Sequence, residues 1–564
     1  MAKNLKEDKS LLGSPATTSG HRAMQGAAVL TLAAIIAKVL SAIYRVPLQN
    51  LVGNEGFYVY QQVYPIYGIG MTFALNGLPS FIGKQVALQN NNKQTKTLIK
   101  RYAAIISVFA LACFAVIYFG AHLIAQTMGD LQLVPVIQSV SFMFLLMPGL
   151  LLSRGFMQGQ NQMTPTAISQ VVEQFVRVAV ILTVAFIFAR MQGAGHQPNV
   201  YQMGFWTMQS AWMAAGAASL VMGFYMLNYR EKIMYQDFLA GHYGLEQAAR
   251  TEKEADLGWQ RLIKDFITEG FVICFFSALL VFYQLIDALT VYDQLVENGL
   301  AMDLAKNVKG IYDRGQPIVQ LGMVVATSLA TSFLPTLALV KKGSHQQVDE
   351  FNLVSRQYLR VTAFFAVIIT GGFISIMPQL NHFLFASRDG SSVLMVYVVM
   401  VIFASLVLGQ NNILQAQGQW YKAGLAFVVG MLVKTLATPG FVSLWDTAGA
   451  AWATNLGLVT MVICLDACLP KPIRLRHLGR LGFKAGILAT LMVSVNFILA
   501  YLCQQVVGLP SSRLLDALLM ASQIFIGVGL AFAYLRKDPI LTKIEWETLP
   551  KGEHIWRLLK GKEA

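Results

Sequence analysis

Apolar runs long enough to cross a membrane recur along almost the whole of this chain, and they constrain its fold more than any other feature. A helix of about 20 apolar residues spans a bilayer core of about 30 Å. Lipid offers no partner to backbone N–H and C=O groups, and no barrel-like alternation is present, so each run is predicted to be a helix. We predict an all-α polytopic fold with fourteen transmembrane spans, numbered in chain order, at 26–47, 58–88, 102–127, 133–156, 164–189, 202–228, 265–291, 309–339, 357–379, 392–416, 421–443, 447–469, 483–507 and 514–535.

The composition agrees with this interpretation. The 564 residues are 55% hydrophobic and only 13% charged, with a mean hydropathy of +0.53, whereas a soluble globular chain carries about 25% charged residues. The apolar runs leave no room for a separate soluble domain. The net charge of +14 does not indicate a nucleic-acid partner, because the basic residues fall in the loops between the runs, as the positive-inside rule predicts.

The distribution of charge over the loops also predicts the orientation. Alternate connections are rich in lysine and arginine, and the others are short and weakly charged, such as 128–130 and 387–390. An even number of spans places both termini on the basic side, which is the cytoplasmic side of the membrane. The polar N-terminus shows no signal-peptide cleavage site, so we interpret it as a cytoplasmic tail before an uncleaved first span.

The chain resembles itself at an offset of about 255–260 residues. Gln158-Gly159-Gln160 matches Gln417-Gly418-Gln419, and the stretch 55–87 is a looser counterpart of 310–338. We therefore predict two six-helix lobes around a central cavity plus two C-terminal helices. The predicted segments are a tail (1–25), an N-lobe (26–228), an amphipathic cytoplasmic linker (229–263), a C-lobe (264–470), spans 13 and 14 (471–536) and a cytoplasmic C-terminal tail (537–564). Paired repeats are common in transporters, although channels also repeat.

Ionisable residues inside the predicted spans carry the functional signal, because each costs roughly 2.5–3.5 kcal/mol at the centre of a membrane helix. Lys38 and Arg45 are seven residues apart and share one helix face, so both are expected to face a cavity. Asp313 and Arg314 are adjacent in span 8. Neighbouring side chains point about 100° apart, so these two are not expected to neutralise each other.

Other charged residues within the spans have simpler interpretations. Glu173 and Arg177 are four residues apart and can pair with each other. Arg154 and Lys434 lie near predicted span ends, so we expect them to extend to the membrane interface. Asp287 in span 7 is the remaining candidate for a coupling role.

The cations point to an anionic substrate in the cavity. Arginine binds phosphate oxygens in a bidentate manner, so a phosphate or pyrophosphate group fits best. A Na⁺- or H⁺-coupled exporter would instead have carboxylates as the main feature of its cavity.

Enzyme chemistry finds little support in the sequence. The five cysteines lie in apolar segments without a histidine or a second cysteine pair beside them, so we expect neither a metal site nor a disulfide framework. We find no nucleotide-binding loop, nucleophile elbow or zinc-protease motif. No cofactor, no metal and no catalytic residue are therefore predicted.

Two stretches resemble a known family. The segment 33–87 is similar to the first two spans of the MurJ-type lipid II flippases, and more specifically to their Gram-positive branch near the stage V sporulation protein B group. The segment 312–338, with Asp313-Arg314 before a glycine-containing run that ends in Leu-Pro, resembles the family's span 8. This branch lies within the multidrug/oligosaccharidyl-lipid/polysaccharide exporter superfamily.

The resemblance implies a flippase that moves an undecaprenyl-pyrophosphate-linked saccharide, lipid II, across the membrane by alternating access, for peptidoglycan synthesis. It places Lys38, Arg45 and Arg314 on the pyrophosphate and saccharide. It gives Asp313 a conformational role through a contact to another helix. We also predict conformational or coupling roles for Glu173, Arg177 and Asp287. The acidic residue of the Gram-negative pattern is absent from 58–65, which puts a transferred coupling mechanism in doubt. We expect a monomer in contact with membrane lipid, and cell-wall synthesis proteins are candidate partners.

Three other functions stay open. The same fold could move a teichoic-acid or capsular unit on the same carrier lipid. A cation-coupled multidrug antiporter would require Asp287 or Glu173 and dispense with Arg314. A scaffold for cell-wall synthases would tolerate neutralisation of the cavity cations.

Overall fold

The computed structural model describes residues 43–89, 92–242, 258–339, 345–503, 512–549 and 552–560, with seven positions between 30 and 41. Within these ranges the regular structure is helical and contains no strand, so the all-α prediction is confirmed. The first half contains α2 (Arg45–Thr72), η1 (Phe73–Gly77), α3 (Leu78–Ala87), α4 (Asn92–Phe119), α5 (Ala121–Thr127), η2 (Leu131–Leu133), α6 (Val134–Ser141), α7 (Met143–Gly159), α8 (Met163–Gly193), α9 (Val200–Met208) and α10 (Ser210–His242).

Span 7, at the start of the second half, is divided into several helices. The second half of the chain is also helical. Its elements are α11 (Trp259–Asp265), η3 (Phe266–Gly270), α12 (Phe271–Ser277), α13 (Leu279–Glu297), α14 (Met302–Tyr312), α15 (Gly315–Leu339), α16 (His345–Phe385), α17 (Ser391–Val398), α18 (Met400–Ala416), α19 (Trp420–Cys468), η4 (Lys471–Ile473), η5 (Leu475–Leu478), α20 (Gly479–Tyr501), α21 (Arg513–Lys537), α22 (Lys543–Glu547) and α23 (Gly552–Lys560). α10 extends into the predicted linker, whose residues 243–257 lie outside the described residues.

Ten helices in the described part of the chain are long and apolar enough to cross a membrane. One of them, α19, contains non-helical backbone at Trp445 and Asp446 and is two helices joined by a kink. Its two arms pack closely, because a Cβ on Gly457 would lie 2.8 Å from the carbonyl oxygen of Gly430. α19 therefore corresponds to the predicted spans 11 and 12, while the total of fourteen stays a prediction.

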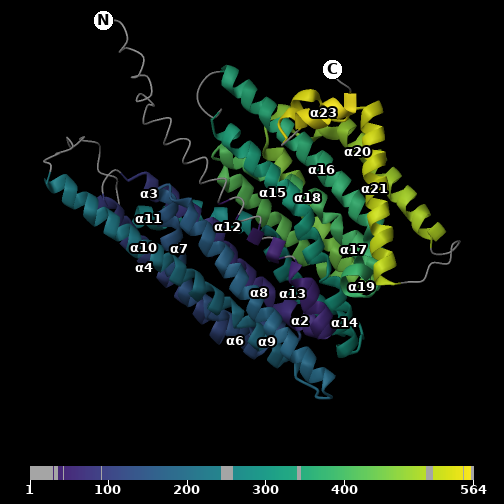
Figure 1. Cartoon of the computed structure of the whole chain (residues 1–564), viewed down its shortest axis with the longest axis horizontal. Helices are drawn as coiled ribbons and strands as arrows, with labels where there is room; N and C mark the ends of the chain where they lie inside the picture. Colours follow the sequence, from purple (N-terminus) through teal and green to yellow (C-terminus); the bar gives the residue numbers. More distant parts are fainter. Residues whose placement is uncertain are drawn as a thin grey trace, which may run out of the picture.

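The helices form two bundles (Figure 1). α3 to α10 make up one bundle, and α15 to α19 belong to the other, with α20 and α21 packed on α16. The bundles lie side by side near α2, α13 and α14 and diverge toward the end where α3 and α23 lie. Span 7 joins them, because α11 and α12 contact α3 and α4 whereas α13 packs on α2 and α19.

The last helices fold back onto α16. Arg360 on α16 forms an ion pair with Glu545 on α22. The neighbouring Trp546 is buried and lies against the rings of Phe364 and Phe365. This contact places the end of the described chain at the divergent end of the bundles (Figure 1).

Candidate functional site

The two bundles touch where α2 meets α14. Asn54 lies just after Gly53, whose φ of 72° interrupts α2 and is a conformation that glycine adopts without steric cost. The Asn54 amide donates to Asn307 at 3.3 Å, and Lys306 lies 3.7 Å from Glu55 at the rim. A Cβ on Gly310 would lie 2.3 Å from the carbonyl oxygen of Asn54. The absence of a side chain at 310 therefore allows the two helices to approach this closely.

Arg314 crosses this contact. It follows the end of α14 and is only 2% exposed. Its Nη2 donates to Asn54 at 2.8 Å, and its Nη1 donates to Asn381 on α16 at 3.0 Å. In this conformation, Arg314 holds α2 against the second bundle through neutral amides.

Asp313 points elsewhere. Both of its oxygens accept from the ammonium of Lys309, at 2.7 and 2.9 Å. Lys309 lies one turn earlier, on α14, so Asp313 pairs within its own segment and not with another helix as the resemblance implied. The expectation that Asp313 and Arg314 do not neutralise each other is confirmed.

A second buried pair forms inside the second bundle. Lys434 on α19 lies 2.9 Å from Asp287 on α13, and its ammonium donates to the Tyr283 carbonyl at 2.7 Å and to Thr454 at 2.8 Å. Tyr312 donates to the other oxygen of Asp287 at 3.0 Å. The prediction that Lys434 extends to the interface is wrong, because its side chain is fully buried and held by the carboxylate of another helix.

The first bundle contains an equivalent pair. Arg154 on α7 donates to Glu173 on α8 at 2.7 Å and to Ser169 at 2.9 Å. The predicted interfacial position of Arg154 is therefore also wrong, since its side chain has no exposure. Glu173 pairs with Arg154 and not with Arg177, because the packing of α7 on α8 brings Arg154 closer than the next helical turn does.

Arg177 instead lies among tyrosines. Its Nη2 donates to the hydroxyls of Tyr44 at 2.7 Å and Tyr60 at 2.9 Å, and the guanidinium lies 4.0 Å from the centre of the Tyr67 ring. Tyr44 and Tyr60 also share a hydrogen bond of 2.6 Å between their hydroxyls. Arg177 thus orients the end of span 1 against span 2.

Arg45 is the most unusual of the buried cations. Its side chain has no exposure, and its guanidinium lies 4.2 Å from the centre of the Tyr64 ring and 5.9 Å from that of Tyr44. Among the residues that the structure describes, none accepts a hydrogen bond of regular geometry from its three nitrogens, and the hydroxyl of the neighbouring Tyr44 is bonded to Arg177 and Tyr60. A buried charge without a hydrogen-bond partner costs free energy, so these N–H groups are available to an anion.

Lys38 lies outside the described residues. In the described ranges, no group of three histidine, cysteine, aspartate or glutamate side chains is arranged to hold a metal ion.

Sequence reasoning missed the amides and tyrosines that surround the cations. Tyr60, Tyr64 and Tyr67 are spaced by four and three residues, so they share one face of α2, and this spacing could have indicated them. Asn54 and Asn381 carried no comparable signal, because their contact with Arg314 depends on how the two bundles pack.

The chain is similar to several known proteins. Residues 23–341 match the model of a family described as polysaccharide biosynthesis protein. The chain is 35% identical to the uncharacterized membrane protein YabM of Bacillus subtilis, over 77% of each chain. It is 24% identical to the lipid II flippase MurJ of the same organism, over 78% of this chain and 81% of that one.

Solved structures share the fold. MurJ in an inward closed conformation matches with a TM-score of 0.62 at 11% identity, over 90% of this chain and 99% of that one. An inward-facing multidrug resistance transporter of the MATE family matches with a TM-score of 0.52 at 11% identity, over 82% and 95%. The family match, the relatives and the all-helical membrane fold lead to one assignment: the chain belongs to the polysaccharide biosynthesis protein family and is a MurJ-type member of the multidrug/oligosaccharidyl-lipid/polysaccharide exporter superfamily.

Proposed function

We propose that this protein is a flippase for a lipid-linked saccharide precursor in a bacterial plasma membrane, with both termini in the cytoplasm. Its two lobes touch at α2 and α14 and diverge at the other end (Figure 1). In an alternating-access cycle, the contact at α2 and α14 opens when the other end closes. The name of one B. subtilis relative, the lipid II flippase MurJ, supports a lipid-linked substrate.

The substrate we propose is lipid II, for peptidoglycan synthesis. The single observation that carries a pyrophosphate ligand is the buried guanidinium of Arg45, whose nitrogens have no acceptor in the described part of the chain. Pyrophosphate oxygens are the acceptors that an arginine binds best. Lys38 and Arg314 would add charge to the same anion once the contact between Arg314 and Asn54 opens.

The cation-coupled antiporter receives less support from the site. It needs a carboxylate that is free to bind the coupling ion. Asp287, Glu173 and Asp313, the three buried carboxylates that the sequence singled out, each lie within 3 Å of a buried lysine or arginine. In the described conformation, these carboxylates are already neutralised.

Complementation tests this proposal. Lipid II in the outer leaflet is measured in cells depleted of their own flippase, with this protein or its Arg45→Gln or Arg314→Ala variant at matched expression. We expect the wild type to restore transport and each variant to reduce it about tenfold or more, since a hydrogen bond to a charged group contributes about 1.5–3 kcal/mol. Arg190→Gln, at the exposed end of α8, is the control and should transport normally.

The other outcomes are equally informative. Full transport by Arg45→Gln would contradict the proposal that Arg45 binds the pyrophosphate. The wild type could fail to restore lipid II transport but restore transport of a teichoic-acid or capsular unit in a matching depletion strain. The protein's substrate would then be that saccharide.

A further inference from the structure

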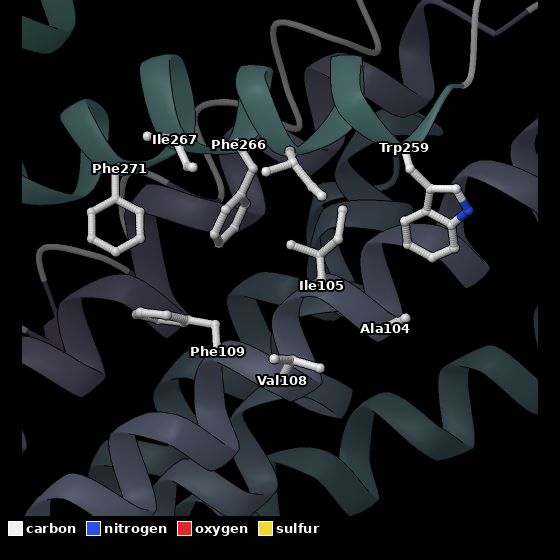
Figure 2. Close-up of a pocket in the computed structure, with 9 residues that line it drawn as sticks. Ala104, Ile105, Val108, Phe109, Trp259, Phe266, Ile267 and Phe271 are labelled. Atoms are coloured by element: carbon white, nitrogen blue, oxygen red, sulfur yellow. The ribbon is translucent and has the colours of Figure 1, made fainter.

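An apolar groove lies outside the site, between α4 and the beginning of span 7 (Figure 2). It has a volume of about 580 Å³. α4 contributes Val108 and Phe109, and span 7 contributes Ile263, Phe266 and Phe271. The groove is therefore a hydrocarbon-lined space between the first bundle and the helix that joins the two bundles.

The two ends of the groove differ. Trp259 lies at one end, while Phe109 and Phe271 lie at the other (Figure 2). The guanidinium of Arg101 lies 5.6 Å from the centre of the Trp259 ring. Arg101 is seven residues before Val108, so the two share one face of α4. One continuous stripe thus begins with a cation beside an indole and continues with hydrocarbon.

The chemistry of this stripe is complementary to that of a phospholipid. Tryptophan and arginine are enriched at the depth of the lipid head groups, and the apolar part faces the acyl chains. The first turns of α4 carry further cations, at Lys93, Lys96 and Lys100, and basic residues near a membrane surface attract anionic lipids. A space of this size holds a ligand of drug-like dimensions, which suits one acyl chain and not the much longer tail of a polyprenyl carrier.

We propose that this groove binds one phospholipid with an anionic head group, its phosphate beside Arg101 and an acyl chain between Phe109 and Phe271. The proposal does not depend on which saccharide the protein transports. Because α11 contacts α4, and Phe271 of α12 lies against Phe109 of α4, while α13 packs on α19, the lipid would stabilise the position of span 7 against the first bundle. A ligand that binds one arrangement better shifts the population toward it.

Native mass spectrometry of the purified full chain tests this site, with phosphatidylglycerol and phosphatidylcholine titrated separately. For the wild type, we expect the first phosphatidylglycerol to bind about fivefold more tightly than phosphatidylcholine, the preference that one cation gives near an anionic head group. Arg101→Gln should remove this preference, and Arg480→Gln, an exposed arginine on α20 in the second bundle, should keep it.

Filling the groove gives an independent readout. Val108→Trp should weaken the first phosphatidylglycerol about tenfold, because the larger ring occupies the space of the chain. Val528→Trp on α21 is the matched control, since both valines are exposed, at 70% and 63%, and it should bind as the wild type does. Ala104→Phe is a second groove-filling variant in case Val108→Trp does not fold.

Several results would overturn the proposal. One is equal affinity of the wild type for the two lipids, and another is undiminished binding by a folded groove-filling variant. Displacement of phosphatidylglycerol from the wild type by undecaprenyl phosphate at equal concentration would assign the groove to the polyprenyl chain instead.

Discussion

Gln61 on α2 and Gln316 on α15 are hydrogen-bonded to each other across the contact between the two lobes, with 3.1 Å between Nε2 and Oε1. They are 255 residues apart, and each is the seventh residue of its repeated stretch, 55–87 or 310–338. This hydrogen bond joins α2 to α15 of the second bundle, and the separation of its two residues falls at the offset of the predicted repeat.

The paired amides predict a non-additive effect on stability. Gln61→Leu or Gln316→Leu alone leaves one buried amide without its partner, which costs about 1–3 kcal/mol, whereas removing both is close to neutral. Thermal unfolding of the two single variants and the double variant measures this coupling. A loss of stability in the double variant equal to the sum of the two single losses would contradict a direct bond between the amides.

A methyl group at Gly310 is expected to separate the lobes. Its Cβ would lie 2.3 Å from the Asn54 carbonyl oxygen, so Gly310→Ala should disfavour the conformation described here. With the native cysteines replaced, cross-linking between Glu55→Cys and Lys306→Cys reports this contact, and we expect its yield to fall. Gly149→Ala, whose Cβ meets nothing within 4 Å, is the control. An unchanged yield in Gly310→Ala would show that α2 and α14 absorb the methyl group without separating.

Removing the ammonium of Lys434 should destabilise the second bundle. Lys434→Met leaves the Asp287 carboxylate buried without a counter-charge, which costs about 3–5 kcal/mol. The midpoint of thermal unfolding in detergent should fall, and Asp287→Asn added to Lys434→Met should restore part of it.

The matched control for this experiment is Lys484→Met, which removes a pair that lies 2.7 Å apart at the surface. Exposed pairs contribute about 0–1 kcal/mol, so its midpoint should hardly change. A loss in Lys484→Met as large as that in Lys434→Met would show that burial does not decide the effect.

Arg177 is predicted to be a positioning residue. Arg177→Lys keeps the charge, but one ammonium cannot reproduce the contacts of a guanidinium with Tyr44, Tyr60 and the Tyr67 ring. Because Tyr44 lies beside Arg45, transport in the complementation assay should fall severalfold while the protein stays folded.

Two comparisons complete this experiment. Arg190→Lys, at the end of α8, should leave transport unchanged. Normal transport by Arg177→Lys at matched expression would show that the guanidinium of Arg177 is not needed to position Tyr44.

The sequence predicted the all-helical class and the long apolar helices because both depend on runs that are local or periodic, while the internal repeat stays a prediction. It failed for Arg154 and Lys434 because position within an apolar run does not reveal a counter-charge on another helix. The spacing of Glu173 and Arg177 suggested a local pair, yet the packing of α7 on α8 supplied a different partner. Pairing in a membrane protein is decided by which helices are neighbours, and hydropathy carries little information about that.

The three ion pairs described above, in which both side chains are buried, each lie within one lobe. Arg154 and Glu173 belong to the first bundle, Asp287 and Lys434 to the second, and Lys309 and Asp313 to a single segment. The contact between the lobes contains amides, Arg314 facing two of them, and a lysine at its rim. Separating a buried ion pair costs several kcal/mol for each ion, whereas water replaces a bond between amides for about 0.5–1.5 kcal/mol. In the proposed cycle, these six charges can therefore stay as neutral pairs, and opening the contact between the lobes requires water to replace the hydrogen bonds of its amides.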